Sequence, residues 1–141
     1  MFYKKFSYSL LLFLLLAQTA QAELAVVVNV DNKEALNIMQ IRNLYLGKIH
    51  TFPSGAEVTV LAQPEHSPAF NEFLSKVLQR SAANLNAYWA RMLFSSRGSP
   101  PRVISSPDKL LKLVQDNPNA IAYVLTSDIK GAKVRIVETF Q

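Results

Sequence analysis

The sequence predicts a single α/β domain in which a mainly parallel or mixed sheet is flanked by helices. Short apolar runs rich in Val, Ile and Ala alternate with segments whose apolar residues recur at helical spacing. The connections between them are short, and the chain contains no repeat or low-complexity linker. Strands that alternate with helices are typical of α/β domains, and the length suits one such domain.

The first half of this pattern begins with a buried strand. Leu24–Val30 is a continuous apolar run, which predicts a strand covered on both faces. Apolar residues at helical spacing predict a helix from Asn37 to Leu46, with Gly47 at the left-handed position that ends it. The residues Phe52-Pro53-Ser54-Gly55 have turn chemistry, and a second strand is predicted over Glu57–Ala62.

Two helices are then predicted in succession. Ser67-Pro68 combines a favoured N-cap with a favoured first helical residue, and the helix is expected to run to about Gln79. Ser81 restarts a helix with one apolar stripe, made of Leu85, Tyr88, Trp89, Met92 and Leu93. We expect the single Trp in this stripe to be a core anchor rather than a ligand-stacking residue.

The last part of the chain returns to strands. Ser95–Pro101 is the most loop-like segment, after which Ser106-Pro107 repeats the cap-plus-Pro pattern and starts a helix that ends near Asn117. Ala120–Leu125 is predicted to be a strand, residues 127–129 one helical turn, and Val134–Val137 a final short strand.

The N-terminal residues indicate secretion. Lys4 and Lys5 precede the apolar run Leu10–Leu16, and Ala20-Gln21-Ala22 is an A-x-A cleavage signature. We therefore expect a signal peptide over residues 1–22, a mature domain over 23–141 and a periplasmic location; an uncleaved anchor is the less favoured alternative. The chain has no Cys, which excludes disulfides, redox thiols and thiolate metal sites.

The charge is mildly basic. The full chain carries +5, and removal of Lys4 and Lys5 leaves 5 − 2 = +3 for the mature domain. The charges are scattered, which suits a small anionic ligand or an acidic partner and does not support nucleic-acid binding.

The sequence gives little support for an enzyme. His50 and His66 are the only histidines, and neither belongs to a metal-binding motif. Glu65-His66-Ser67 contains triad residue types, but there is no G-x-S-x-G elbow, Walker A motif or dinucleotide fingerprint. We expect no catalytic residue, metal or cofactor.

An anion site is the better-supported hypothesis. A helix that begins just after a strand presents free N–H groups and the positive end of its dipole, so the Ser67 hydroxyl and the amides of Ala69 and Phe70 could bind a small oxyanion. Arg97, in the loop Ser95–Pro101, is the candidate cation. The alternatives are that Ser67 is only a helix cap, that Arg97 is a solvated surface residue, and that Glu65 repels an anion or itself caps the helix.

Several segments in order resemble the phosphate ABC-transporter substrate-binding proteins, the PstS-like members of the type 2 periplasmic-binding-protein class. These are IRNLYLGKI (41–49), VTVLAQPEHSPAF (58–70), AYWARMLF (87–94) and NPNAIAYV (117–124), within a match over about Ala25–Val137. The resemblance is to the short, stand-alone members. It implies about one lobe of a two-lobed α/β clamshell, since a full binding protein is about twice as long.

The resemblance also implies a phosphate-like ligand. The family's loop typically reads R-S-D-G-S-G-T, and the matching stretch here is QPEHSPA (63–69), in which Ser67 falls on the phosphate-contacting serine and Gln63 or its neighbour on the arginine. Gln63, His66, Ser67, Ala69 and Arg97 are therefore the candidate ligand-binding residues. The implied function is oxyanion binding linked to phosphate uptake or sensing. The alternative is a non-catalytic accessory domain that presents the former cleft to a membrane receptor or transporter.

Overall fold

The computed structural model describes residues 22–141 and contains one mixed five-stranded sheet of order β3-β2-β4-β1-β5. The first strand, β1 (Leu24–Asn29), is antiparallel to both of its neighbours, β4 (Ala120–Leu125) and β5 (Val134–Phe140). On the other side of β4, β2 (Thr59–Ala62) and β3 (Arg102–Val103) run parallel to it and to each other. The predicted α/β class with a mixed sheet is confirmed.

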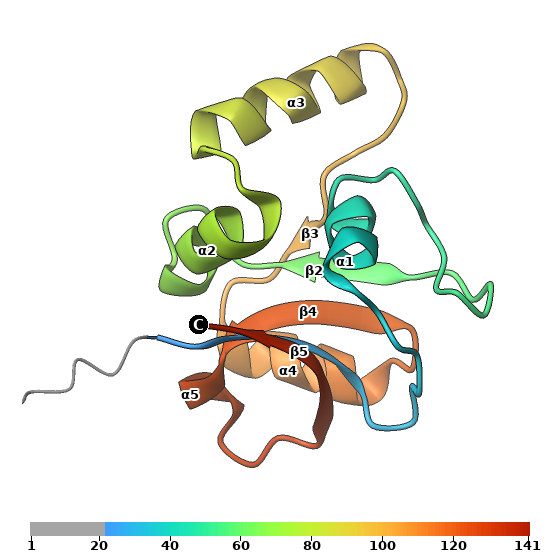
Figure 1. The fold of residues 1–141 in the computed structure, drawn as a ribbon, viewed down its shortest axis with the longest axis vertical. Helices are drawn as coiled ribbons and strands as arrows, with labels where there is room; N and C mark the ends of the chain where they lie inside the picture. Colours follow the sequence, from blue (N-terminus) through green and yellow to red (C-terminus); the bar gives the residue numbers. More distant parts are fainter. Residues whose placement is uncertain (1–21) are drawn as a thin grey trace, which may run out of the picture.

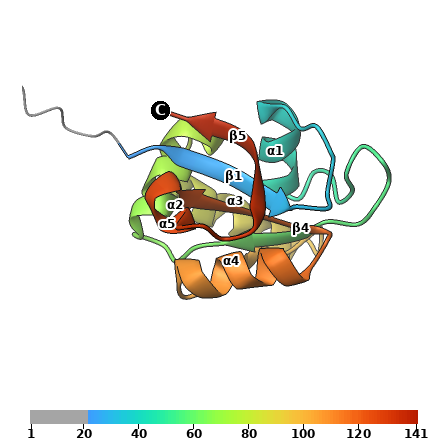
Figure 2. The same ribbon diagram turned by 90° about the horizontal axis from the view of Figure 1, so that it is seen from below.

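Helices cover both faces of this sheet, as Figures 1 and 2 show from two directions. One face carries α1 (Ile38–Tyr45), α2 (Pro68–Phe73) with the π-helix η1 (Leu74–Leu78), and, farthest from the sheet, α3 (Ala82–Phe94). The opposite face carries α4 (Pro107–Asp116), and α5 (Thr126–Ile129) follows β4 at its end.

The central strand β1 is buried over its whole length, as its continuous apolar run predicts. Leu24, Val26 and Val28 pack into the core beneath α1 and α2. Ala25 and Val27 point to the other face and pack with the apolar residues of α4. Because both faces of β1 are covered, it needs no polar side.

The structure differs from the sequence-based expectation at two strand boundaries, in the type of one helix and in one additional strand. β2 begins at Thr59, because Glu57 instead forms an isolated bridge with Thr51. The helix predicted to run to about Gln79 does end there, with Gln79 as its C-cap, but from Leu74 onward it is a π-helix. β5 extends beyond Val137 to Phe140, since it pairs along the whole of β1 with a register shift. β3 was not predicted, because two residues are too few to show a periodicity.

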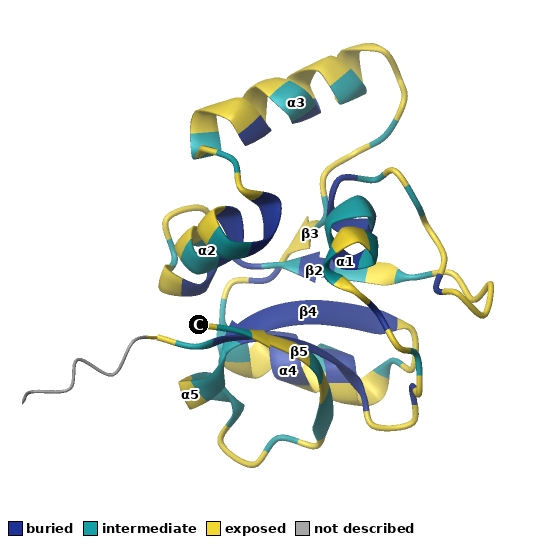
Figure 3. Cartoon of the chain, in the orientation of Figure 1, coloured by how far each residue is buried: buried dark blue, intermediate teal, exposed yellow. Residues whose placement is uncertain are grey.

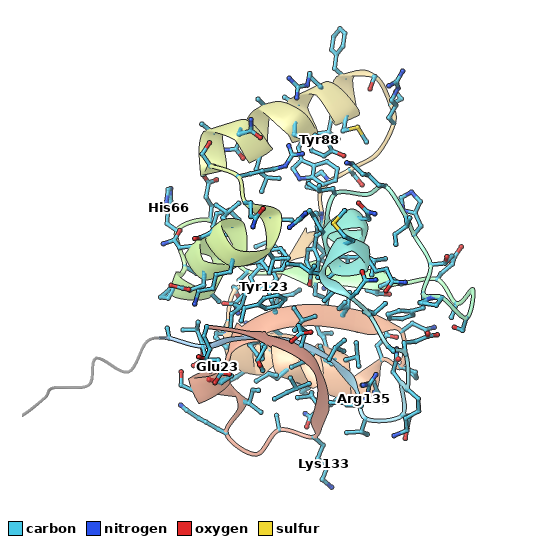
Figure 4. All side chains as sticks on the ribbon, viewed as in Figure 1. Glu23, His66, Tyr88, Tyr123, Lys133 and Arg135 are labelled. Carbon is cyan, nitrogen blue, oxygen red and sulfur yellow. The ribbon has the colours of Figure 1, made fainter. Side chains whose placement is uncertain are left out.

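The apolar stripe of α3 is only partly buried. Trp89 is 8% exposed and packs on Gly47, where a Cβ atom would lie 3.2 Å from its Cη2, so the predicted anchor role is confirmed. Tyr88 points from α3 toward the sheet side and donates a 2.6 Å hydrogen bond to the carbonyl of Leu46 (Figure 4). Leu93, at the end of the stripe, is 54% exposed.

Within residues 22–141, no helix has both the length and the apolar character needed to cross a bilayer. The predicted signal peptide lies outside the described residues, except for Ala22.

Candidate functional site

Two parallel strands end side by side at one edge of the sheet. Ala62, the last residue of β2, pairs in register with Val103, the last residue of β3. The chain then leaves β2 for α2 on one face and leaves β3 for α4 on the opposite face. Such a divergence opens a crevice beyond the carboxyl ends of the strands, which is the usual ligand position in α/β sheets.

The start of α2 lies at this edge. The Ser67 hydroxyl accepts a 3.2 Å hydrogen bond from the amide of Phe70, and Pro68 is the first helical residue. The Ala69 amide donates to no backbone carbonyl in the described residues. The Ser67 hydroxyl accepts a hydrogen bond and can still donate its own proton to another one. Two donors therefore remain, the Ser67 hydroxyl and the Ala69 amide, whereas the sequence suggested the Phe70 amide as well.

The turn before α2 places His66 in an unusual backbone conformation. The Ser67 amide donates to the carbonyl of Pro64 at 3.1 Å, and His66, the third residue of this turn, has a φ of 70°. A positive φ at this position of a turn favours glycine and is uncommon for a residue that has a side chain. The imidazole is largely exposed and points away from the molecule (Figure 4).

No catalytic triad is assembled at this turn. His66 Nε2 lies 3.8 Å from Glu65 Oε1, but no hydrogen bond in the described residues joins the imidazole to the Ser67 hydroxyl. The Ser67 oxygen is used as a helix cap instead.

Glu65 does not cap α2. Its Oε1 accepts a 3.4 Å hydrogen bond from Asn86 Nδ2, on the first turns of α3. The carboxylate is therefore turned toward α3 and the His66 ring. This answers the alternative in which Glu65 would occupy the N–H groups of α2.

Gln63 is bound to the core of the sheet. Its backbone amide donates to the Tyr123 hydroxyl at 3.0 Å, and its side-chain Nε2 donates to the Tyr123 carbonyl at 2.9 Å. The residue is 4% exposed. Burial raises the pKa of Tyr123 to about 12, while the hydrogen bond from the Gln63 amide acts in the opposite direction.

Arg97 is not brought to the start of α2. It lies three residues beyond the end of α3 and is exposed, and no hydrogen bond or ion pair of the described residues links it to Ser67. The cation that the sheet places beside the end of β2 is Arg102, which pairs in register with Leu61. Sequence reasoning missed Arg102 because β3 itself was not predicted.

A second capped helix starts at the same edge. Ser106 accepts a 3.3 Å hydrogen bond from the Lys109 amide, and Pro107 is the first residue of α4. Asp108 in its first turn places a carboxylate beside this positive helix end, whereas the first turn of α2 holds no acidic residue. An anion is therefore favoured at α2 over α4.

A mostly apolar cavity of about 150 Å³ lies between this edge, α2 and α3. Of the five candidate residues, Gln63 lines it and the others do not. The lining includes side chains from the sheet and from all three neighbouring helices: Tyr45, Gln63, Glu65, Phe70, Phe73, Leu85, Asn86, Trp89 and Tyr123. Among the described residues, no group of three or more His, Asp or Glu side chains could hold a metal ion.

Comparisons with known proteins place this fold. No family model matches the sequence, and no curated protein matches it either. Similar solved structures include three that match over 83% of this chain. A phosphate ABC transporter substrate-binding protein from Clostridium perfringens, with phosphate bound, has a TM-score of 0.61 and 23% identity. An ABC-type phosphate transport receptor from Vibrio cholerae has 0.64 and 20%, and PstS from Borrelia burgdorferi has 0.61 and 11%.

The match covers 45%, 46% and 47% of those three chains, so this chain spans less than half of their length. The fold is therefore that of about one lobe of a phosphate-binding receptor, as the sequence resemblance implied.

Proposed function

We propose that this chain is an exported, non-enzymatic solute-binding protein that binds phosphate or another small oxyanion at the start of α2. In the similar structure from Clostridium perfringens the bound molecule is phosphate. A role in phosphate uptake or sensing would follow from such binding. The proposed organisation is a signal peptide over residues 1–22 and a periplasmic domain over residues 23–141.

The proposal is supported by the hydrogen-bond donors at the N-terminus of α2 that have no acceptor among the described residues. Ser67 and Ala69 offer a hydroxyl proton and an amide proton at the positive end of a helix whose first turn is free of acidic residues. The hydrogen bond from Asn86 keeps the nearest carboxylate, Glu65, turned toward α3. A small anion would gain from both donors and from the helix dipole.

A thermal-shift experiment tests the proposal. Millimolar phosphate should raise the Tm of the purified protein, because a ligand that binds only the native state stabilises it by mass action. The Ser67→Ala variant should lose most of this rise. Ser81→Ala is the matched control, since Ser81 also caps a helix, through a 3.1 Å bond from the Asn84 amide, but lies at α3.

Both variants lose a cap, which costs about 1 kcal/mol of stability, so each is compared with its own phosphate-free Tm. Equal phosphate shifts in the two variants would remove Ser67 from the site. No shift of the parent protein with phosphate, sulfate or small carboxylates would refute oxyanion binding.

The one-lobe fold of the described residues favours one second candidate, the accessory domain. A clamshell encloses its ligand between two lobes, and this chain has the fold of about one. The domain would then use the crevice beyond β2 and β3 to contact a membrane transporter or receptor. Co-purification of a defined envelope protein with the parent chain, but not with Ser67→Arg, would support this candidate. Recovery of no such protein under mild conditions would count against it.

A further inference from the structure

The end of α3 exposes two large apolar side chains. Phe94 is 95% exposed and Leu93 is 54% exposed, at the last two positions of the helix. α3 lies at one extremity of the molecule, and the residues around its end are exposed (Figures 1 and 3). Leu93 and Phe94 together form a small exposed apolar patch at the end of the helix, which we name the α3 tip.

The backbone holds the α3 tip in place. Ser96 takes a left-handed conformation with a φ of 55°, and its amide donates to the carbonyl of Leu93 at 3.1 Å. The next amide, of Arg97, donates to the carbonyl of Met92 at 2.9 Å. This pair of bonds is a Schellman motif, which closes the helix end. The apolar side chains are therefore presented by an ordered helix end rather than by an open loop.

All charged residues in the segment around the α3 tip are basic. From Phe73 to Pro107 the sequence contains no Asp or Glu, and its basic residues are Lys76, Arg80, Arg91, Arg97 and Arg102. Lys76 pairs with Glu72, and Arg80 donates to Asn84. Arg91, Arg97 and Arg102 take part in no ion pair within the part of the chain that the structure describes. Arg91 lies three residues before Phe94, so both occupy the same side of the helix.

We propose that the α3 tip docks on the surface of an anionic phospholipid bilayer. Phe94 and Leu93 would enter the interface between headgroups and acyl chains, and Arg91 and Arg97 would contact lipid phosphates. An apolar contact combined with adjacent basic residues is the combination that binds proteins to anionic membrane surfaces. The proposal is independent of oxyanion binding at α2.

A bilayer fits the tip better than a protein partner does. A stable protein complex needs about 800 Å² on each partner and a complementary surface, whereas the tip offers two projecting side chains. A fluid interface needs no preformed pocket. A second copy of this chain, joined through the same tip, would bring Arg91 and Arg97 against their own counterparts, and like charges in an interface oppose association.

The proposal is tested by measuring how the purified protein binds to lipid vesicles. The protein is purified from cells that express the full chain. Vesicles of equal parts phosphatidylglycerol and phosphatidylcholine should bind the protein, and vesicles of phosphatidylcholine alone should bind it far less. The variant L93S/F94S should lower the partition coefficient about tenfold. The control Met39→Ser removes an equally exposed apolar side chain (52% exposed) on α1 and should change nothing. Thermal melts confirm that each variant folds.

The charged residues are tested in the same assay. R91Q/R97Q should weaken binding at low salt and should make it less sensitive to added salt, because fewer cations are left to be screened. Phosphate and chloride at matched ionic strength should release the protein equally. Release by phosphate far below the matching chloride concentration would mean that these arginines bind free phosphate, which would overturn the proposal.

The absence of Cys from the chain permits a direct measurement of which surface touches the lipid. An environment-sensitive dye on Ser95→Cys should shift to the blue with anionic vesicles, while the same dye on Ser54→Cys, in the loop before β2, should not. This readout reports on the tip whatever the N-terminal residues do. Equal responses at the two positions, or no loss of binding in L93S/F94S, would overturn the proposal.

Discussion

Gln63 and Tyr123 are joined by two hydrogen bonds, one from the Gln63 backbone to the Tyr123 side chain and one from the Gln63 side chain to the Tyr123 backbone. The Gln63 amide donates to the Tyr123 hydroxyl at 3.0 Å, and Gln63 Nε2 donates to the Tyr123 carbonyl at 2.9 Å. The ring of Tyr123 is stacked on Phe73 of α2, with centroids 4.0 Å apart. Gln63, the residue just before the turn that ends at Ser67, is thereby fixed to β4.

Removal of the Tyr123 hydroxyl should be costly. In Tyr123→Phe the buried Gln63 amide loses its acceptor, and an unpaired buried donor costs about 1–3 kcal/mol. Urea unfolding measures this loss. The control is Tyr88→Phe, where the lost hydroxyl donates to the Leu46 carbonyl at a part-buried site, and an unpaired carbonyl is tolerated better than an unpaired amide. A smaller loss in Tyr123→Phe than in Tyr88→Phe would contradict this account.

The protein should lose stability at alkaline pH. Burial raises the pKa of Tyr123 from 10.0 to about 12 and that of Tyr45 well above its usual value, so the unfolded chain releases these protons first. Each group therefore contributes stability that is complete below pH 10 and falls as pH rises, for Tyr123 through about pH 12. Unfolding free energies measured between pH 9 and 12 should fall less steeply in Tyr123→Phe. An equal slope would be evidence against the raised pKa.

Gly47→Ala should shift the Trp89 side chain of α3 slightly. Gly47 has a φ of 66°, and a Cβ atom there would lie 3.2 Å from Trp89 Cη2. Gly131→Ala is the matched control, because Gly131 has a φ of 79° but no atom within 4 Å of the new Cβ. Both variants should lose about 1–2 kcal/mol from backbone strain, and only Gly47→Ala should also change the fluorescence of Trp89, the single Trp. Identical stability and fluorescence in the two variants would mean that Trp89 does not depend on Gly47.

His66 should tolerate glycine and reject valine. Its φ of 70° is accessible to Gly without strain, whereas a β-branched residue in this region is an outlier. His66→Val should lower the free energy of unfolding by about 1–2 kcal/mol, and His66→Gly should leave it close to that of the parent. The exposed imidazole contributes little to either result. Chemical denaturation of the two variants side by side decides the point.

Elements with strong local patterns were predictable from the sequence. The buried runs of β1 and β4, the Ser-Pro start of α4 and the left-handed Gly47 all lie where residue chemistry places them. β3 was missed because its two residues are held by their neighbour β2 rather than by any pattern of their own. The π-helix at Leu74 was missed because its apolar residues fit an ordinary helix equally well.

The candidate site was only half predictable. Ser67 as the cap of α2 follows from local sequence, and the structure has this cap. The bond from Gln63 to Tyr123 joins residues far apart in the sequence, so no local pattern reveals it. Arg97 was chosen from loop chemistry alone, which says nothing about whether the loop after α3 comes close to Ser67. Whether these residues bind a ligand is still a prediction.

The position of β1 has a consequence for how the chain acquires its structure. The first strand of the sheet lies between β4 and β5, so its two partners are the last two strands of this sheet in chain order. Until they emerge, β1 is an apolar segment with both edges open, and its pairing must close a loop of nearly the whole domain. Stable pairing of β1 therefore waits until both β4 and β5 have been synthesised, and the two edges of this strand stay without their sheet neighbours until then.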